Sequence, residues 1–324
     1  MDLNFLFNSG KNPKWKYYLK NFINNSIPKA FFRSQLKGYL DEFEKRDDKE
    51  YILQRVNYYN KLSEKADLPN NAIQLKENEV GNVSSVYYYD AQEIIRYFNP
   101  TLKWFNCYGD ITHIPDVPSI LKSRPIHGEN QNSVILKLEK VRHFIFLKDK
   151  KAFRDKWNKI IFRGKIVGKQ HRIDFMEKYF GNPMFDIGDV SKHQVKPEWK
   201  ALKKTLWQHL DYKFIMSIEG NDVASNLKWV MSSNSIAVMP KPTYETWFME
   251  GTLIPDFHYI EIKPDYSDIE ERINYYIENP EKAEEIIKNA NAYCTQFFDA
   301  KRERIISLLV MKKYFEMTNQ NYLN

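Results

Sequence analysis

The chain has 324 residues, a formal net charge of +7 and a hydrophobic content of 43%, and its length favours two domains over one core. No run approaches the roughly 18 apolar residues that cross a membrane, and two cysteines are too few for a disulfide framework. The start MDLNFLFNSGKNPKWKYY lacks the pattern of a secretory signal peptide, so we expect a soluble protein of the reducing cytoplasm.

The positive charge fits three kinds of partner: nucleic acid, an anionic membrane surface or an acidic small molecule. The lysines are spread along the chain without an Arg-rich arm, zinc-ligand spacing or an RNA-binding aromatic signature, which argues against nucleic acid. Scattered lysines beside exposed Trp or Tyr would suit docking on an anionic inner membrane.

The first half is expected to begin with a helical preface over residues 1–80. Apolar residues recur there at three- and four-residue spacing in 15–23, 31–43 and 51–62. From Val83 the pattern changes to two β-rich runs, VSSVYYYD and LKWFNCYGD, with a short helix AQEIIRYF between them. A strand over 143–147 closes this half.

The second half alternates strands and helices. A strand over 159–162 leads through a polar loop to a helix opened by Arg172, and a further helix is expected around 199–210. Strands are then expected over 214–218 and 235–239, followed by a strand starting at His258-Tyr259 and by three helices. These helices are expected to run from about 265–268 to 276, from 280 to 298 and from 300 to 317. Such alternation in both halves favours two parallel-sheet domains that face a cleft.

Two strand-turn-helix segments of the second half are typical of phosphate sites. The first runs from Gly220 to Lys228, where a glycine allows close backbone approach and a helix N-terminus offers free N–H groups. The second is Phe162-Arg163-Gly164 followed by Arg172, whose arginines could neutralise a diphosphate. We expect both loops to converge on one nucleotide diphosphate. Glu245 could accept hydrogen bonds from ribose hydroxyls or compensate the charge of a helix N-terminus.

Asp110 follows the strand KWFNCY, and the ligand crevice of an open α/β sheet lies at the carboxyl ends of its strands. It is therefore a candidate general base, with a turn-capping aspartate as the equal alternative. Asp90 is expected to cap the helix AQEII, and His143 is expected to be structural.

The segment 122–126 places two cations near the same rim. Lys122, Ser123 and Arg124 could hold a phosphate or an anionic acceptor there, or form a solvated basic loop. The seven histidines show no metal-ligand spacing, so no metal is expected. The sequence also lacks the GxSxG, Walker and GxGxxG motifs.

Five segments, in order over roughly two hundred residues, resemble glycosyltransferase family 90, which includes capsule-associated domains and the protein O-glucosyltransferases. They are GDITHIPDVPSILKSRPI at 109–126, FRG at 162–164 with Arg172, EGNDVASNLKW at 219–229, YETWFMEGTLIPDFHYIEI at 244–262 and DYSDIEERINYYIENPEKAEEII at 265–287. The chain looks most like the bacterial branch, which is associated with lipopolysaccharide or surface polysaccharide.

The resemblance implies an α/β fold of the GT-B type, with two Rossmann-like domains facing a cleft. The expected domains are an acceptor-side domain over 1–155, a nucleotide-sugar domain over 156–299, and a C-terminal helix over 300–324 that returns to the first domain. The implied activity is inverting transfer from a UDP-sugar, the co-substrate, without a bound metal or other cofactor.

The resemblance also assigns residues by position. Asp110 matches the catalytic base of the family, and Gly164, Lys165 and Arg172 match its first donor loop. The second donor loop matches Asp222, Val223, Ala224, Ser225, Asn226 and Leu227, next to Gly220 and Asn221. Eukaryotic members carry an arginine at the position of Leu227, so Lys228, or Arg172 with Arg163, would have to supply that charge.

We therefore expect a cytoplasmic enzyme that moves glucose, xylose or a related sugar to a hydroxyl of a glycan or lipid-linked saccharide. A catalytically inactive nucleotide-sugar-binding protein of envelope assembly is the first alternative. A basic nucleic-acid-binding protein is the second.

Overall fold

The computed structural model describes residues 9–80 and 84–322, and the chain divides into two compact units. Unit 1 contains the described part of Met1–Asn12, together with Arg142–Pro242 and Thr252–Gln296. Unit 2 contains Pro13–Val141, Thr243–Gly251 and Phe297–Asn324 within the described residues. The chain thus passes between units at 141/142, whereas the expected boundary was 155/156, and a short segment around Glu245 belongs to the unit of the first half.

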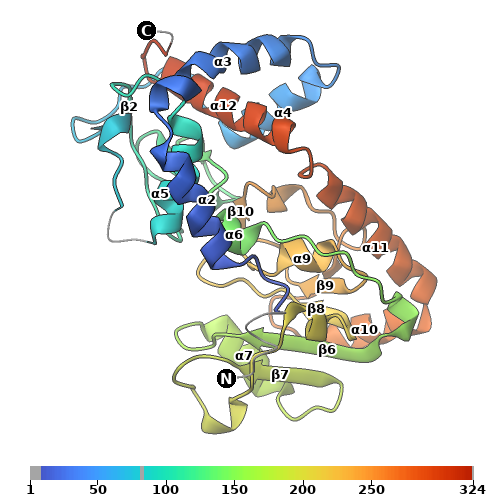
Figure 1. The fold of residues 1–324 in the computed structure, drawn as a ribbon. Coiled ribbons are helices and arrows are strands. Elements are labelled where there is room, and N and C mark those ends of the chain that lie inside the picture. Colours follow the sequence, from blue (N-terminus) through green and yellow to red (C-terminus); the bar gives the residue numbers. More distant parts are fainter. Residues whose placement is uncertain (1–8, 81–83, 323–324) are drawn as a thin grey trace. The chain divides into compact units, whose positions relative to one another are not determined.

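Unit 1 is built on a five-stranded parallel sheet. Its strands are β6 (Trp157–Gly164), β7 (Phe185–Asp189), β8 (Tyr212–Met216), β9 (Ile236–Met239) and β11 (Ile260–Glu261). They lie in the order β11-β9-β8-β6-β7, and Figure 1 shows β9, β8, β6 and β7 side by side in this order. The chain therefore turns back between β6 and β8, as in a doubly wound α/β sheet.

The core of unit 1 follows the two-residue period of its strands. Ile160 and Phe162 of β6 share one hydrophobic cluster with alternate residues of β8 and β9. Apolar residues of three helices complete this cluster, namely α7 (Gln170–Tyr179), α10 (Ile269–Glu278) and α11 (Pro280–Thr295). The expected strands over 159–162, 214–218 and 235–239 and the expected helices from Arg172, 265–268 and 280 are confirmed to within a few residues.

The helix expected around 199–210 is wrong. Two short pieces occur there, η3 (Pro197–Trp199) and α8 (Leu206–His209). Between them Lys200 bridges to Asp189, and the Ala201 N–H donates to the Asp189 carbonyl at 3.0 Å. Helix resumes only after Thr205, whose side chain accepts from the Gln208 N–H in a capping box.

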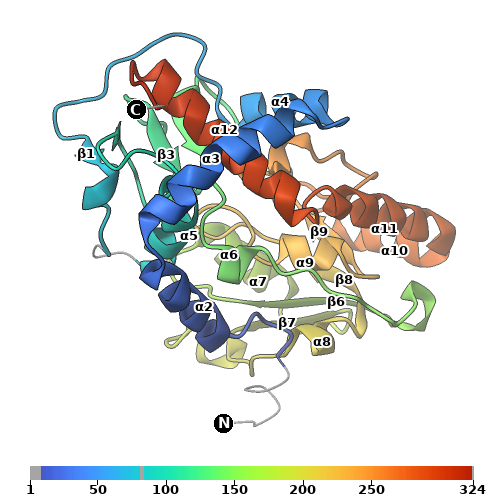
Figure 2. The same ribbon diagram turned by 45° about the horizontal axis from the view of Figure 1, so that its top comes forward.

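Six helices belong to the part of unit 2 that the structure describes or to its junction with unit 1. They are α2 (Lys14–Ser26), α3 (Lys29–Glu44), α4 (Lys49–Tyr59), α5 (Ser85–Ile95), α6 (Lys140–His143) and α12 (Ala300–Met317). The helical preface and the last helix are therefore confirmed. Figures 1 and 2 show α12 lying along α3 and α4, and its central residues are buried.

The strands of unit 2 are short. In the described residues, β1 (Ile73–Gln74) pairs with β2 (Lys103–Trp104) and β4 (Ser123–Pro125) with β10 (Tyr244–Thr246), both antiparallel. A third pair, β3 (Ser119–Leu121) with β5 (Ser133–Ile135), is parallel. The α/β class is confirmed, but the described part of unit 2 holds these two-stranded pairs where a second extended Rossmann-like sheet was expected. A GT-B arrangement stays a proposal.

The predicted strand VSSVYYYD is wrong. It begins at Val83, which lies outside the described residues, and from Ser85 onward the chain is helical in α5. Val86, Ala91 and Ile94 are buried on this helix, so packing overrides the strand preference of Val and Tyr. Asp90 lies inside α5 and accepts from Tyr17 Oη at 2.7 Å and from the Lys140 N–H at 2.8 Å. It therefore does not cap the helix AQEII as expected, and binds instead the first N–H of α6.

The predicted strand over 143–147 is also wrong. His143 ends α6, and residues 144–147 have no regular structure. The Leu147 N–H donates to Ser232 Oγ at 2.9 Å instead of to a neighbouring strand. The His143 ring is buried, as expected of a structural histidine.

A buried histidine makes the stability of unit 1 sensitive to acid. His209 Nδ1 donates to the Thr205 carbonyl at 2.7 Å, and burial lowers the pKa of His209 from 6.5 to about 4. Between these pH values the unfolded chain binds a proton that the folded chain does not. The stabilisation is therefore complete above pH 6.5 and is lost as the pH falls towards 4, by up to about 3 kcal/mol.

We expect His209→Gln to weaken this pH dependence in urea unfolding between pH 7 and 4, because the variant lacks the titrating ring. His193→Gln, at an exposed position, is the matched control and should keep the pH dependence of the natural chain. An identical pH dependence in all three proteins would contradict the assignment.

Candidate functional site

The carboxyl ends of β6 and β8 define the candidate donor site of unit 1. In a doubly wound sheet the ligand crevice lies where the strand order reverses, outside the carboxyl ends of the two strands. Here those strands end at Gly164 and Met216. The two loops that the sequence selected, after Phe162 and around Gly220, start from these two ends and therefore do converge.

Arg172 joins the two loops. From α7 its Nε donates to the Glu219 carbonyl at 2.8 Å and its Nη2 to the Ile218 carbonyl at 2.7 Å, both after β8. Its Nη1 donates to the Lys165 carbonyl, after β6, at 2.9 Å. Burial lowers the pKa of Arg172 to about 10, so the guanidinium remains charged at neutral pH. One cation thus fixes the backbone of both loops.

The FRG segment supports this arginine. The Arg172 guanidinium lies 5.5 Å from the centre of the Phe162 ring, and that ring packs edge-on against Phe175. A Cβ added at Gly164 would lie 2.4 Å from the Phe162 ring, far inside contact distance. Glycine at 164 therefore leaves room for the aromatic ring beneath Arg172.

The Arg163 side chain binds Asp186 of β7 and Leu202. Its Nη1 donates to the Asp186 carbonyl at 2.8 Å and its Nε to the Leu202 carbonyl at 3.2 Å, and it also forms an ion pair with the Asp186 carboxylate. Burial opposes ionisation of Asp186, but the hydrogen bond from Tyr212 and the contacts with Arg163 outweigh it and lower the pKa of Asp186. In this structure Arg163 links β6 to β7 and does not join Arg172 at the two loops, contrary to the expectation. Lys165 is exposed.

The second donor loop is held by short-range hydrogen bonds. The Gly220 N–H donates to the Asp222 carbonyl, and Asn226 Nδ2 donates to the Met216 carbonyl, both at 2.9 Å. Asp222, Val223 and Ala224 are buried, Gly220, Ser225 and Asn226 are half-buried, and Asn221 is exposed. A Cβ at Gly220 would make only ordinary contacts, so the fold of this loop does not itself require glycine.

The helix of the segment from Gly220 to Lys228 begins only at Leu227. The helix α9 (Leu227–Met231) has five residues, so its dipole is weaker than the sequence suggested. Leu227 and Lys228 are 2% and 0% exposed. Lys228 therefore does not present a surface charge in place of the arginine that relatives carry.

Asp110 lies in unit 2, beside a buried cation. Its carboxylate, 27% exposed, forms an ion pair with Lys122, whose side chain is 1% exposed. Glu139 Oε2 lies 3.5 Å from the same Lys122 Nζ, and Tyr87 Oη donates to Glu139 at 3.4 Å. A buried ammonium favours the ionised form of a neighbouring carboxylate. Asp110 is thus the partly exposed end of a row of buried polar side chains that continues through Lys122 and Glu139 to Tyr87.

Arg124 and Glu245 form a buried ion pair in unit 2. Arg124 Nε donates to Glu245 Oε1 at 2.8 Å, and the two side chains are 0% and 2% exposed. Arg124 also donates to the carbonyls of Tyr58, Tyr59 and Ser133, and Tyr58 Oη donates to Glu245. The antiparallel pairing of β4 with β10 sets Arg124 opposite Glu245.

Lys122, Ser123 and Arg124 are all buried in or beside β4, so they do not form the solvated basic loop of the alternative interpretation, and their role at an anionic acceptor stays a prediction. Glu245 belongs to unit 2, whereas the two donor loops belong to unit 1. The structure thus separates the predicted residues into a donor group around Arg172 and a second group around Asp110.

Sequence reasoning missed two residues near these groups. Glu139 has a left-handed backbone, with φ of 56°, and meets Lys122; no motif marks it. Ser217 directly follows β8 and is 1% exposed, and its Oγ has no hydrogen-bond partner among the described residues. Ser217 could have been predicted from its position, because it directly follows a strand at the point where the strand order of the sheet reverses.

Within 9–80 and 84–322 there is no group of three or more His, Cys, Asp or Glu that could hold a metal ion. In the same ranges, none of the helices combines the length and apolar composition needed to cross a bilayer.

A doubly wound parallel sheet with two loops joined at its strand reversal defines an α/β protein, whose ligand crevice is expected at that reversal. Residues 133–321 match the model of Glycosyl transferase family 90, which is more than half of the chain, and the chain belongs to this family. The family supports sugar transfer from a donor to an acceptor. The matched segment contains both donor loops but begins after Asp110.

The relatives agree with this family. The chain is 39% identical to the O-glucosyltransferase LpsA of Dichelobacter nodosus over 306 residues, which cover 94% of this chain and 96% of that protein. It is 25% identical to protein O-glucosyltransferase 3 of Homo sapiens and 26% identical to that of Rattus norvegicus over 168 residues. These two alignments cover 50% of this chain and 32% of each relative.

Proposed function

We propose that the protein is an inverting glycosyltransferase that moves glucose, xylose or a related sugar from a UDP-sugar to a hydroxyl acceptor. The observation that carries this proposal is Arg172, which ties the two loops at the strand reversal of a family 90 sheet. The acceptor we propose is a glycan or lipid-linked saccharide of lipopolysaccharide or surface polysaccharide, modified on the cytoplasmic side of the membrane.

The donor half of the reaction needs positive charge where the diphosphate leaves. Arg172 has five N–H groups, of which the carbonyls of Lys165, Ile218 and Glu219 occupy three. The remaining N–H groups and the backbone N–H groups of residues 223–226 are suited to hydrogen-bond phosphate oxygens. Such fixed dipoles and charge stabilise a leaving UDP without reorganisation, so we propose that no metal takes part.

The acceptor half needs a base. In the proposed step, the acceptor hydroxyl gives its proton to the Asp110 carboxylate while its oxygen bonds to the anomeric carbon. The bond from that carbon to the diphosphate oxygen breaks, and its electron pair leaves with UDP. Attack from the face opposite UDP inverts the configuration. Lys122, buried beside Asp110, holds this carboxylate through an ion pair.

We expect Arg172→Met to weaken UDP binding by at least about tenfold, because charge-assisted hydrogen bonds contribute about 1.5–3 kcal/mol. Calorimetry of the purified chain with UDP, GDP and CMP, each with and without EDTA, checks the nucleotide and the metal together. UDP should bind best, and EDTA should not change its Kd.

The matched control is Arg154→Met, an exposed arginine of unit 1 that pairs with Glu284; its UDP affinity should equal that of the natural chain. A folded Arg172→Met variant with unchanged UDP affinity would remove Arg172 from the donor site.

A catalytically inactive nucleotide-sugar-binding protein is the second candidate. The burial of Leu227 and Lys228 favours it, because neither side chain replaces the arginine that relatives carry in this loop. It predicts UDP binding without turnover of any UDP-sugar, whereas the main proposal predicts both.

A further inference from the structure

The helix α2 (Lys14–Ser26) is attached to unit 2 by its polar side. Tyr17 Oη donates to Asp90 Oδ1 at 2.7 Å and to the Val86 carbonyl at 3.2 Å. Asn21, one turn later, is 8% exposed, and Ser85 Oγ donates to Tyr18 Oη at 3.3 Å. A surface helix normally turns its apolar stripe inward, so this orientation is inverted.

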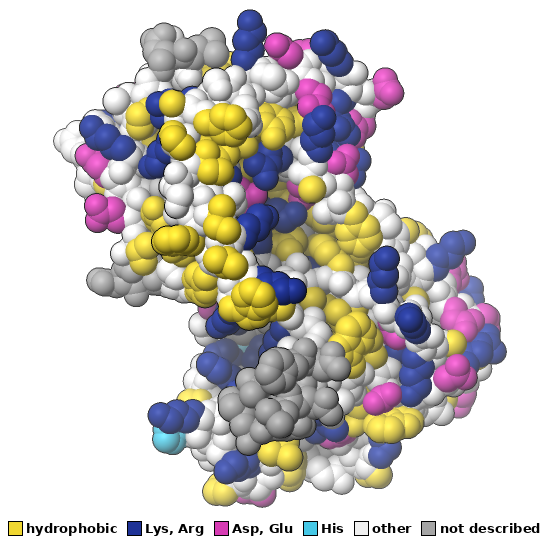
Figure 3. All heavy atoms as spheres, viewed as in Figure 1, with side chains coloured by type: hydrophobic (Ala, Val, Ile, Leu, Met, Phe, Trp, Pro, Cys, Tyr) yellow, Lys and Arg dark blue, Asp and Glu magenta, His cyan; other side chains and the backbone are white. Residues whose placement is uncertain are grey.

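The apolar stripe of α2 faces solvent. Trp15, Leu19, Phe22 and Ile23 are 65%, 51%, 67% and 56% exposed. Their spacing of four, seven and eight residues from Trp15 places them on one face of the helix. Figure 3 shows apolar side chains gathered along α2 with lysines beside them. We call these four residues the α2 stripe.

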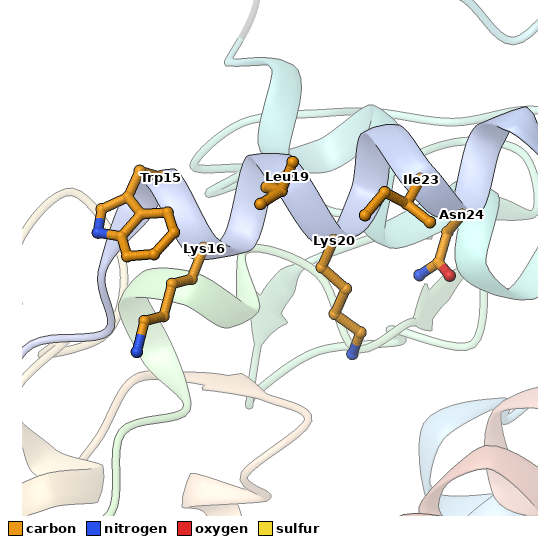
Figure 4. Close-up of a pocket in the computed structure, with 6 residues that line it drawn as sticks. All are labelled: Trp15, Lys16, Leu19, Lys20, Ile23 and Asn24. Atoms are coloured by element: carbon orange, nitrogen blue, oxygen red, sulfur yellow. The ribbon is translucent and has the colours of Figure 1, made fainter.

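Lysines border the α2 stripe on one side. Lys16 and Lys20 extend in parallel from α2, next to the row formed by Trp15, Leu19 and Ile23 (Figure 4). These residues line a shallow pocket together with Asn24. An ammonium beside an exposed apolar row is the arrangement found on helices that lie in a membrane interface.

The charge around α2 has one sign over a long segment. Between Asp2 and Asp41 the sequence contains seven Lys and Arg residues and no Asp or Glu. The next helix, α3 (Lys29–Glu44), begins with Lys29 and the 55% exposed Phe31. An anionic surface is the electrostatic complement of such a segment, and lipid head groups also leave room for apolar side chains below them.

We propose that the α2 stripe and its bordering lysines form a docking surface for an anionic lipid bilayer, in which α2 lies parallel to the membrane plane. Trp15 and Phe22 enter the boundary between head groups and acyl chains, and Lys16 and Lys20 meet lipid phosphates. The surface is built from unit 2 residues alone and does not depend on the proposed sugar transfer, which UDP binding tests separately.

Vesicle flotation of the full chain tests the proposal. The chain should float with vesicles of phosphatidylglycerol and phosphatidylcholine in equal parts, bind far less to pure phosphatidylcholine, and dissociate as salt is raised. Lys16→Gln with Lys20→Gln should lower the partition coefficient about fivefold for each lysine. Trp15→Gln with Phe22→Gln should abolish flotation while UDP affinity stays unchanged.

The matched control is Leu202→Gln with Ile254→Gln, which changes two exposed apolar residues of unit 1 and should float like the natural chain. Absence of flotation with anionic vesicles, or equal flotation of the α2 variants, would overturn the proposal. Self-association that the Trp15 and Phe22 changes abolish, without vesicle binding, would instead assign the α2 stripe to a second copy of the chain and would also overturn it.

Discussion

Replacing Asp110 with Asn is expected to lower the kcat of sugar transfer by about 10²- to 10⁴-fold, the usual contribution of a general base. The amide cannot take the proton of the acceptor hydroxyl, whereas the donor loops of unit 1 remain intact. The Kd for UDP should therefore stay within about twofold of the natural value, inside the few-tenths kcal/mol scatter typical of a change away from the site. Release of UDP in the presence of acceptor, measured beside calorimetry, separates the two effects.

The matched control for this variant is Asp116→Asn, an exposed aspartate of the same segment, which should keep full turnover. A folded Asp110→Asn protein with near-normal turnover would show that Asp110 is the turn-capping residue of the alternative interpretation. Because Asp110 lies ahead of the segment that matches the family, this variant tests the base assignment independently of family membership.

Replacing Glu245 with Ala is expected to destabilise the fold by about 3–5 kcal/mol, the cost of leaving one partner of a buried ion pair unpaired. Arg124, 0% exposed, would lose the carboxylate that its Nε meets at 2.8 Å. Urea unfolding measures the loss. The affinity for UDP should not change, because the Glu245 carboxylate is 2% exposed and is already bound by Arg124 and Tyr58.

Two further variants test whether the loss of stability in Glu245→Ala comes from the unpaired buried charge. Glu284→Ala breaks the exposed pair with Arg154 and should leave the unfolding midpoint unchanged. Arg124→Met with Glu245→Leu removes both charges and should cost less than Glu245→Ala alone. Unchanged stability of Glu245→Ala together with weaker UDP binding would instead support the role at the ribose hydroxyls.

Long amphipathic helices and buried parallel strands could be predicted from the sequence. The helix α12 (Ala300–Met317) matches its prediction residue for residue, and α3 and α4 lie within three residues of theirs. Strands β6, β8 and β9 were visible as short apolar runs, because parallel strands covered on both faces are apolar throughout.

Segments whose structure depends on distant partners could not be predicted. The run from Val83 contains residues that favour strands, yet its described part forms α5, because burial of Val86, Ala91 and Ile94 decides the outcome. Residues 200–201 pair with the end of β7 rather than form a helix. Neither partner can be identified from local spacing.

The candidate site shows the same limit. Arg172 and Gly164 were predictable because both belong to one strand-turn-helix pattern, in which Gly164 ends the strand β6 and Arg172 lies in the first turn of the helix α7. The positions of Arg163 and Glu245 depend on strand pairing: β6 beside β7 brings Asp186 to Arg163, and β4 opposite β10 brings Arg124 to Glu245. The stacking of Tyr59 on Trp247 at 3.8 Å likewise holds residues 243–251 in unit 2.

The central claim is that this chain binds a UDP-sugar and activates it for transfer. Hydrolysis of a panel of UDP-sugars by the purified protein tests this claim without knowledge of the acceptor, because water can replace the acceptor hydroxyl slowly. We predict UDP release from one or a few of these donors, glucose and xylose among the candidates, which persists in EDTA and falls sharply in Arg172→Met. Absence of both UDP binding and UDP release across the whole panel would contradict the proposed function.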